Sequence, residues 1–241
     1  MNTHEKLDLY VNSLISELER HIAAPIKDAI FQIKGSHRRL LALRGYLRYP
    51  SLDRGSIDDN WAWDKEKEEE FISSGLREEF CAEVAKVKRA FEASMTGYQL
   101  QGGVKVRTLS RQIDLWNGNE TVNKFGLTLH RKCLEEVEHG GYGDVPETSD
   151  LARFRDFLAG KGLVGSPSNA TPGLSDHGQA RAIDFSVYRG KLEVAGQSTK
   201  TAKEKWDKPG FTEALRAAAR GSKLSGPLKA PYEPWHYSFI P

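Results

Sequence analysis

The sequence predicts an α+β fold in which a small antiparallel sheet is flanked by helices and preceded by a helical N-terminal extension. Apolar residues recur at helical spacing through most of residues 1–91. This pattern is lost after Gly97, and short alternating segments joined by a glycine-containing turn follow toward the C-terminus. We therefore expect two domains: a helical region over residues 1–91, to which the sequence assigns no role, and a second domain over residues 92–241.

The first domain is expected to contain three helical stretches. Residues 4–23 place apolar side chains every three or four positions, which is typical of an amphipathic helix. Residues 26–48 predict a second helix whose basic residues favour a solvated face, and the turn-rich residues 50–60 predict a connection. The acidic run after Trp63 predicts an exposed helix start, and a longer helix then continues to near Gly97.

The second domain alternates shorter elements. Residues 98–110, which contain a glycine pair and the alternating Val104 and Val106, predict a strand, and residues 182–196 predict a hairpin that turns at Arg189-Gly190. A long loop is expected over residues 165–175 and a final short strand within residues 231–241. The predicted helices cover residues 111–116, residues 125–138, a stretch capped by Ser149-Asp150, and residues 211–220.

Composition excludes several classes of protein. The chain has 241 residues and a formal net charge of +2, which is too balanced for a dedicated nucleic-acid binder. Two cysteines, Cys81 and Cys133, support neither a disulfide framework nor a cysteine-type zinc site. We expect no membrane span and no secretory signal peptide, so the chain is expected to be made in the cytoplasm.

The stretch "GLSDHGQARAIDF", residues 173–185, contains a histidine and an aspartate seven positions apart. A straight strand would separate His177 and Asp184 by about 23 Å, and a straight helix by about 10 Å. Two ligands of one zinc ion must lie within roughly 3–4 Å of each other, so the chain must fold back between them. The segment "EPWHY" near the C-terminus offers a third ligand, His236, and a carboxylate, Glu233, that can take a proton from a metal-bound water.

These residues resemble the motifs of the zinc peptidases of the D-alanyl-D-alanine carboxypeptidase type. That family includes VanY- and VanX-like D,D-peptidases and phage L-alanyl-D-glutamate endopeptidases. "PGLSDHGQARAID" is similar to its Ser-x-His-(x)6-Asp motif, "EPWH" to its Glu-x-x-His motif, and "VRTLSRQIDLW" to its arginine-strand element. The resemblance covers roughly residues 92–241. Ala180 stands where a glycine is common in the family, and Val106 where an aromatic residue often precedes the arginine.

The resemblance implies a zinc-dependent hydrolase on a Hedgehog or D,D-peptidase-like fold. One Zn²⁺ ion would be held by His177, Asp184 and His236. Glu233 would be the general base, Arg107 would polarise the scissile carbonyl, and Ser175 would contact the substrate. The implied substrate is a D,D peptide bond in the stem peptides of peptidoglycan, cut by a carboxypeptidase or by a cross-link endopeptidase.

Three alternatives stay open at this stage. An L-alanyl-D-glutamate endopeptidase, as in endolysins, is the nearest. A zinc-containing binding module without peptidase activity is another, since the Hedgehog signalling domain resembles this family. The expected lack of a signal peptide also suggests a delivered lytic protein, such as an endolysin or an antibacterial effector, that acts in the periplasm or cell wall with a delivery or immunity partner.

Overall fold

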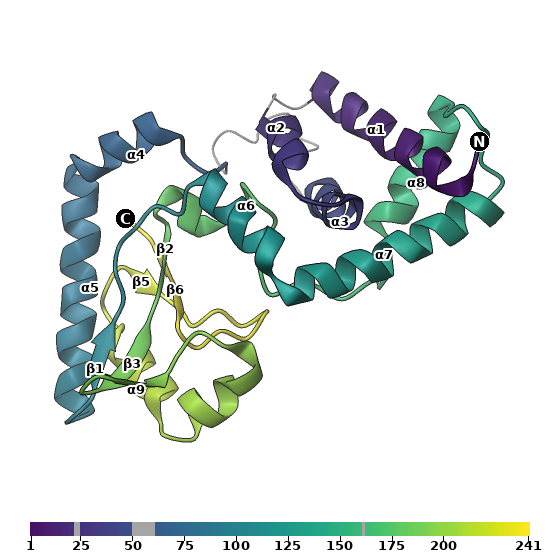
Figure 1. Ribbon diagram of the computed structural model, residues 1–241. Helices are drawn as coiled ribbons and strands as arrows, with labels where there is room; N and C mark the ends of the chain where they lie inside the picture. The colour runs from purple at the N-terminus through teal and green to yellow at the C-terminus, as the bar shows by residue number, and fades with distance from the viewer. Residues whose placement is uncertain (22–24, 50–60, 161) are drawn as a thin grey trace. The chain divides into compact units, whose positions relative to one another are not determined.

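The computed structural model describes residues 1–21, 25–49, 61–160 and 162–241, which form two compact units (Figure 1). The first unit combines Met1–Trp61 with Leu109–Ser175, and the second combines Ala62–Thr108 with Asp176–Pro241. Each unit has its own hydrophobic core. The predicted boundary between residues 91 and 92 differs from this division, because it falls inside a helix whose apolar face is buried in the core of the second unit.

The first unit is helical within its described residues. Its helices are α1 (Thr3–His21), α2 (Pro25–Gln32), α3 (Ser36–Leu47), α6 (Leu109–Gly118), α7 (Glu120–His139) and α8 (Thr148–Ala159). Helix α3 packs closely on α7, since a Cβ atom at Gly126 would lie only 2.8 Å from the carbonyl oxygen of His37. Glycine is therefore needed where these two helices cross.

Two predictions in this unit were wrong in detail. The single helix expected over residues 26–48 is broken between α2 and α3, where Gly35 has a φ of 82°. The N-cap of α8 is Glu147 rather than Ser149 or Asp150. The Asp150 carboxylate instead accepts hydrogen bonds at 3.1 Å from the Tyr10 hydroxyl and from the backbone N–H of Gly143.

The second unit contains two three-stranded antiparallel sheets. The first sheet has the order β1-β3-β4, formed by β1 (Gln99–Gln101), β3 (Ser186–Arg189) and β4 (Leu192–Ala195). The second has the order β2-β6-β5, formed by β2 (Ala182–Asp184), β6 (His236–Phe239) and β5 (Leu224–Ser225). The first sheet thus joins the two chain segments of this unit through the pairing of β1 with β3, whereas all strands of the second sheet come from the later segment.

The hairpin predicted near residue 190 is confirmed: β3 and β4 pair around Gly190, which has a φ of 59°. The first predicted strand of this hairpin is nevertheless interrupted at Phe185, so that it forms two strands, β2 and β3, which belong to different sheets. The strand predicted within residues 98–110 is present as β1, but it ends at Gln101 and does not include Val104 and Val106. A Cβ atom at Gly102 would lie 2.8 Å from the Phe185 ring, and this close approach marks the point where the chain leaves the sheet.

The second unit also contains helices and short helical turns. They are α4 (Lys65–Ile72), α5 (Gly75–Ser94), η3 (Asp176–Gln179), η4 (Thr199–Thr201), the π-helical turn η5 (Lys203–Asp207) and α9 (Phe211–Ala218). Helix α5 is anchored on β6 by Phe80, whose ring stacks on Phe239 with centroids 4.2 Å apart. Exposed α4 begins at Asp64, whose carboxylate accepts from the backbone N–H of Lys67, as expected for the acidic helix start.

The α+β class predicted from the sequence is confirmed, with two small sheets where one was expected. None of the described helices has the length and apolar character needed to cross a membrane. The predicted connection over residues 50–60 and the end of the helix predicted to reach residue 23 lie outside the described residues.

Candidate metal centre

The pairing of β2 with β6 brings together two side chains that are far apart in the sequence. In this antiparallel register Asp184 lies directly opposite His236. The backbone N–H of Phe185 donates to the carbonyl oxygen of Trp235 at 3.0 Å and continues the pairing by one residue. Side chains directly opposite each other on one face of such a pair have Cβ atoms about 5 Å apart. Two of the predicted ligands are therefore fixed by sheet register rather than by a loop.

The third predicted ligand reaches this strand pair through a tight turn. His177 lies in η3, and the backbone N–H of Arg181 donates to the carbonyl oxygen of Asp176 at 2.9 Å, which closes the turn before β2 begins. Ala180 has a φ of 49°. The chain thus folds back between His177 and Asp184, as the ligand spacing requires.

Two backbone hydrogen bonds hold this turn in place. The carbonyl oxygen of His177 accepts from the N–H of Arg107 at 2.8 Å, and the carbonyl oxygen of Gly178 accepts from the N–H of Trp63 at 2.8 Å. Both donors come from the earlier chain segment of the second unit. The Trp63 ring itself packs on Phe71, with centroids 5.4 Å apart.

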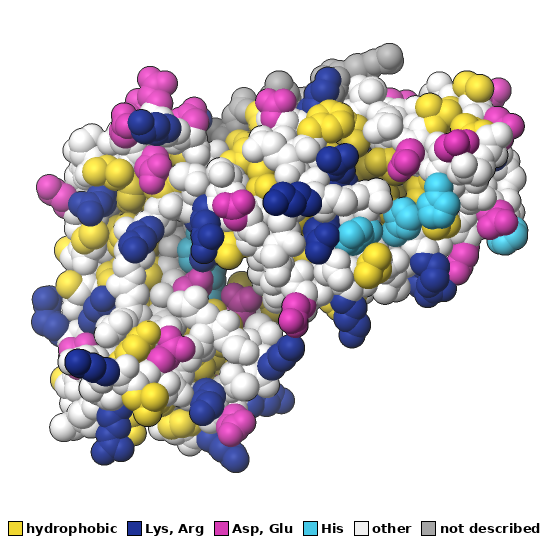
Figure 2. All heavy atoms as spheres, in the orientation of Figure 1, with side chains coloured by type: hydrophobic (Ala, Val, Ile, Leu, Met, Phe, Trp, Pro, Cys, Tyr) yellow, Lys and Arg dark blue, Asp and Glu magenta, His cyan; other side chains and the backbone are white. Residues whose placement is uncertain are grey.

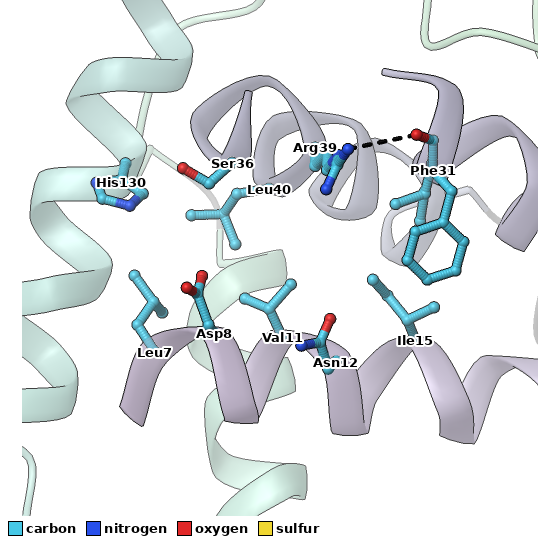
Figure 3. A pocket seen from close by; sticks show the side chains of 11 residues that line it. Leu7, Asp8, Val11, Asn12, Ile15, Phe31, Ser36, Arg39, Leu40 and His130 are labelled. Carbon is cyan, nitrogen blue, oxygen red and sulfur yellow. Dashed lines mark hydrogen bonds between the residues drawn. The ribbon is translucent and has the colours of Figure 1, made fainter. Parts of the chain in front are cut away.

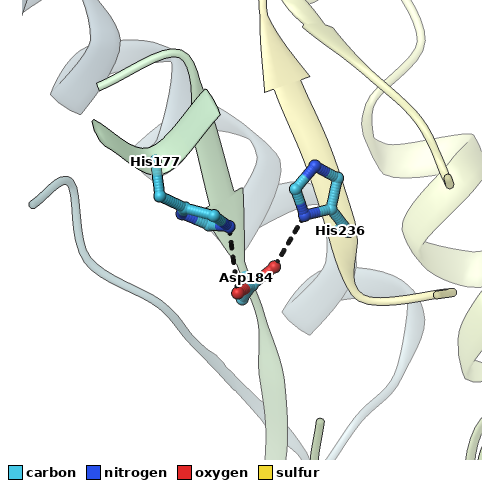
Figure 4. Close-up of side chains that lie close together, drawn as sticks. All are labelled: His177, Asp184 and His236. Carbon is cyan, nitrogen blue, oxygen red and sulfur yellow. Dashed lines mark hydrogen bonds and ion pairs between the residues drawn. The ribbon is translucent and has the colours of Figure 1, made fainter. Parts of the chain in front are cut away.

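The Asp184 carboxylate lies between the two imidazole rings (Figure 4). Its Oδ2 is 3.1 Å from Nε2 of His177, and its Oδ1 is 2.9 Å from Nδ1 of His236. One ligand atom from each residue lies within 4.8 Å of the other two. Both histidines are buried and the aspartate is half-buried. Small side-chain rotations would bring these atoms to the separation of about 3–4 Å that a tetrahedral ion needs.

The electrostatics of the cluster favour an ionised carboxylate. Burial raises the pKa of Asp184, but hydrogen bonds from His177 and His236 outweigh it and hold the pKa well below its usual range. Burial lowers the pKa of His236, yet the hydrogen bond and the charge of Asp184 leave it above the ordinary histidine value. The cluster is therefore an anionic oxygen between two nitrogen bases, a donor set that divalent transition metals prefer.

Glu233 and Arg107, the two residues predicted to act on a substrate, also lie at this cluster. Oε2 of Glu233 is 3.9 Å from Nδ1 of His236, and Nη2 of Arg107 is 3.4 Å from Oδ2 of Asp184. Glu233 lies in the turn before β6, where its N–H donates to the carbonyl oxygen of Leu228 at 3.0 Å. Burial raises the pKa of the Glu233 carboxyl above its ordinary value, which moves it toward the range of a general base that works near neutral pH.

Ser175, the predicted substrate-binding residue, is half-buried and is the last residue of the first unit. The structure therefore does not join it to the cluster in the second unit. The Pro172-Gly173 stretch before it is held within the first unit, since Gly173 donates its N–H to Oε1 of Gln112 at 2.9 Å. Pro172 accepts from the Tyr46 hydroxyl at 2.8 Å.

One feature of the site was not expected from the sequence. Gln179 is a buried polar side chain, 4% exposed, in the same helical turn as His177. A glutamine between two small residues carries no signal that distinguishes it from a surface residue, so only the fold reveals its burial. The backbone donor at Trp63 is equally invisible in the sequence, because it depends on contacts between segments more than 100 positions apart.

The conformation of Ala180 gives a testable consequence. Ala180→Val should lower the free energy of unfolding by about 2 kcal/mol or more, because a β-branched side chain at positive φ is strained. Ala180→Gly should stay within about 1 kcal/mol of the parent protein, since relief of strain offsets the added chain entropy. Urea denaturation of the three proteins measures both effects, and a valine variant as stable as the parent would contradict the positive φ.

The first unit has a pocket of its own, between α1, α2, α3 and α7 (Figure 3). It has an apolar floor that includes Leu7, Val11 and Leu40. His130 lies at its edge, and burial together with the nearby His4 lowers the pKa of this histidine.

Among the residues that the structure describes, only His177, Asp184 and His236 have the geometry of a three-ligand metal site.

These observations define a candidate metal centre of two histidines and one aspartate, accompanied by a glutamate and an arginine. The cluster could bind a metal ion. Comparisons with known proteins found no match: no family model, no curated protein and no solved structure matches the chain.

Proposed function

We propose that the chain is a zinc-dependent peptidase that hydrolyses a D,D peptide bond in peptidoglycan. The observation that carries the proposal is the proximity of a glutamate carboxylate to a cluster of three ligands: Oε2 of Glu233 is 3.9 Å from Nδ1 of His236. The motif order supports the substrate class, because all three elements resemble the D-alanyl-D-alanine carboxypeptidase family. We also propose that the second unit has the Hedgehog or D,D-peptidase-like fold of that family.

The donor set suits zinc. Two imidazole nitrogens and one carboxylate oxygen are three ligands of the types that zinc accepts in catalytic sites, which keep one position for water or substrate. His177, Asp184 and His236 would hold the ion. When bound, zinc supplies a Lewis acid that lowers the pKa of a water molecule toward about 7.

The other residues of the chain then have defined tasks. Glu233 accepts a proton from the attacking water as the water oxygen bonds to the carbonyl carbon. As the carbon–nitrogen bond breaks, Glu233 passes this proton to the leaving amine nitrogen. Arg107, whose guanidinium stays charged, offers N–H donors to the carbonyl oxygen as negative charge develops there.

Metal analysis and product analysis together test this function. The purified chain should contain one zinc ion, and mass spectrometry of digested muropeptides should show release of D-alanine or separation of D,D cross-links. Products cut between L-alanine and D-glutamate would instead assign the chain to the endolysin-like alternative. Stoichiometric zinc without any cleavage would favour a binding module and reject the peptidase.

Acidification should weaken zinc binding. A histidine ligand must be neutral, and the pKa of His236 is raised above the ordinary value, so protons compete with the metal as the pH falls through this pKa. For one displaced proton, the affinity should fall about tenfold per pH unit below the pKa of His236 and level off above it. Competition with a chromophoric chelator between pH 8 and pH 5.5 measures this, and an affinity that does not change would exclude His236 as a ligand.

A further inference from the structure

The second unit carries a concentration of positive charge away from its acidic helix α4. Residues 186–231 contain ten Lys and Arg but only four Asp and Glu, a net charge of +6 in a chain whose total is +2. All ten cationic side chains are exposed. We call these residues the basic surface: Arg189, Lys191, Lys200, Lys203, Lys205, Lys208, Arg216, Arg220, Lys223 and Lys229.

The four carboxylates in this stretch offset only part of its ten positive charges, and three of the four are held by neighbouring groups. The engaged pairs are Glu193 with the Tyr188 hydroxyl at 3.0 Å, Asp207 with the Thr212 and Tyr232 hydroxyls at 2.6 and 2.5 Å, and Glu213 with Arg216 at 2.7 Å. Only Glu204 is left without such a partner among the described residues.

Most of the cations, by contrast, are unpaired. Arg216 and Lys223 pair with Glu213 and Glu79, and Arg189 lies 5.9 Å from the centroid of the Tyr98 ring. Within the described part of the chain, the others form no ion pair: Lys191, Lys200, Lys203, Lys205, Lys208, Arg220 and Lys229. Lysine side chains that are exposed and unpaired remain available to an anionic ligand.

The backbone beneath the central lysines is fixed. Trp206 in η5 is fully buried, and its indole N–H donates to the carbonyl oxygen of Gly196 at 2.9 Å. Lys205 is next to this anchor, and Lys203 and Lys208 lie within three positions of it. Figure 2 shows dark blue Lys and Arg side chains spread over the part of the second unit where Figure 1 labels β3 and α9. The positive charge is thus carried by an ordered segment.

We propose that the basic surface binds a phosphodiester polyanion of the cell wall, of the poly(glycerol phosphate) class. The choice of a wall polymer rests on the proposed function. Ammonium groups bind phosphates with release of counterions, which needs no shaped pocket. Binding of this kind would keep the protein on its insoluble substrate between cleavage events.

The aromatic residues of the stretch disfavour a single-stranded nucleic acid as the partner. Proteins that bind single strands stack bases on exposed aromatic rings. Here Trp206 and Phe211 are buried, and Tyr188 is half-buried with its hydroxyl bonded to the Glu193 carboxylate. A polymer without bases needs no such rings.

Co-sedimentation of the full chain with cell walls tests the proposal. The chain carries Glu233→Gln, so that the walls stay intact, and the walls either retain or lack poly(glycerol phosphate). The test variant is Lys203→Gln with Lys205→Gln and Lys208→Gln. The matched control removes the same charge elsewhere, through Lys65→Gln, Lys67→Gln and Lys124→Gln.

We expect salt-sensitive binding to the phosphate-bearing walls alone. Each lost phosphate contact lowers the slope of log affinity against log salt by about 0.7–0.9, so the test variant should lose about 2 units of slope and at least about tenfold in affinity at low salt. The control should match the parent. When Glu233 is kept, the parent, the test variant and the control variant should all cleave a short soluble stem peptide at the same rate.

Three results would overturn the proposal. These are equal binding to walls that lack the phosphate polymer, equal binding by test and control variants, and displacement by single-stranded DNA at lower phosphate concentration than by poly(glycerol phosphate). Because the readout is binding, it does not depend on hydrolysis. Absence of zinc or of cleavage would reject the proposed function while leaving the measured polyanion binding in place.

Discussion

Replacement of Glu233 by glutamine should reduce peptide hydrolysis by about 10²–10⁴-fold, the contribution typical of a positioned general base. Glutamine has nearly the same shape but cannot take a proton from water. The three ligand residues are unchanged, so the zinc content should stay at one ion per chain. Turnover of a stem peptide and metal analysis on the same sample measure both quantities.

The control for this variant is a carboxylate elsewhere in the second unit. Glu204→Gln removes one negative charge from an exposed residue of η5 and should leave turnover unchanged. A general loss of activity in both variants would point to net charge rather than to proton transfer. Unchanged cleavage by Glu233→Gln alone would reject the assignment of the base.

The second large effect is expected at Asp184. Asp184→Asn should weaken zinc binding by more than about 100-fold, a loss beyond that seen when only a residue supporting a ligand is removed. The carboxylate has neighbours at both oxygens, namely His177, His236 and Arg107, so its charge balances the whole cluster. Hydrolysis should be lost together with the metal, unlike in Glu233→Gln.

Excess zinc distinguishes the loss of hydrolysis in Asp184→Asn from the loss of hydrolysis in Glu233→Gln. If Asp184→Asn is a ligand variant, raising free zinc should restore part of the metal content measured by equilibrium dialysis. Asp176→Asn, an exposed residue in the turn with His177, is the matched control and should bind zinc like the parent. Full zinc affinity in Asp184→Asn would contradict its role as a ligand.

The α+β class and most helices could be predicted from the sequence because their signals are local. The face formed by Phe80, Val84 and Val87 repeats at helical spacing, and the helix is found there. The break at Gly35 is local, because this glycine has a positive φ that ends α2 before α3. The division at Phe185 depends instead on which distant strands β2 and β3 pair with, and the local sequence does not specify these partners.

The site was predictable to the extent that its residues lie in spaced motifs. His177, Asp184, His236 and Glu233 come from two short stretches, and these are side by side because β2 pairs with β6. The positive φ of Ala180 could not be read from alanine, which rarely adopts it. The Ser175 assignment rested on the resemblance to the Ser-x-His motif, and the chain passes from the first unit to the second directly after this residue.

The interleaving of the two units also limits how this architecture can be recombined. Neither unit is a contiguous cassette, so a genetic cut at residue 91 would remove α4 and nearly all of α5 from beneath β6. A graft that transfers hydrolytic function to another scaffold must carry residues 62–108 together with residues 176–241. It must also replace residues 109–175, which belong to the first unit, with a new linker between these two segments. Gene fusions are better placed at the chain ends than at the junction suggested by the motifs.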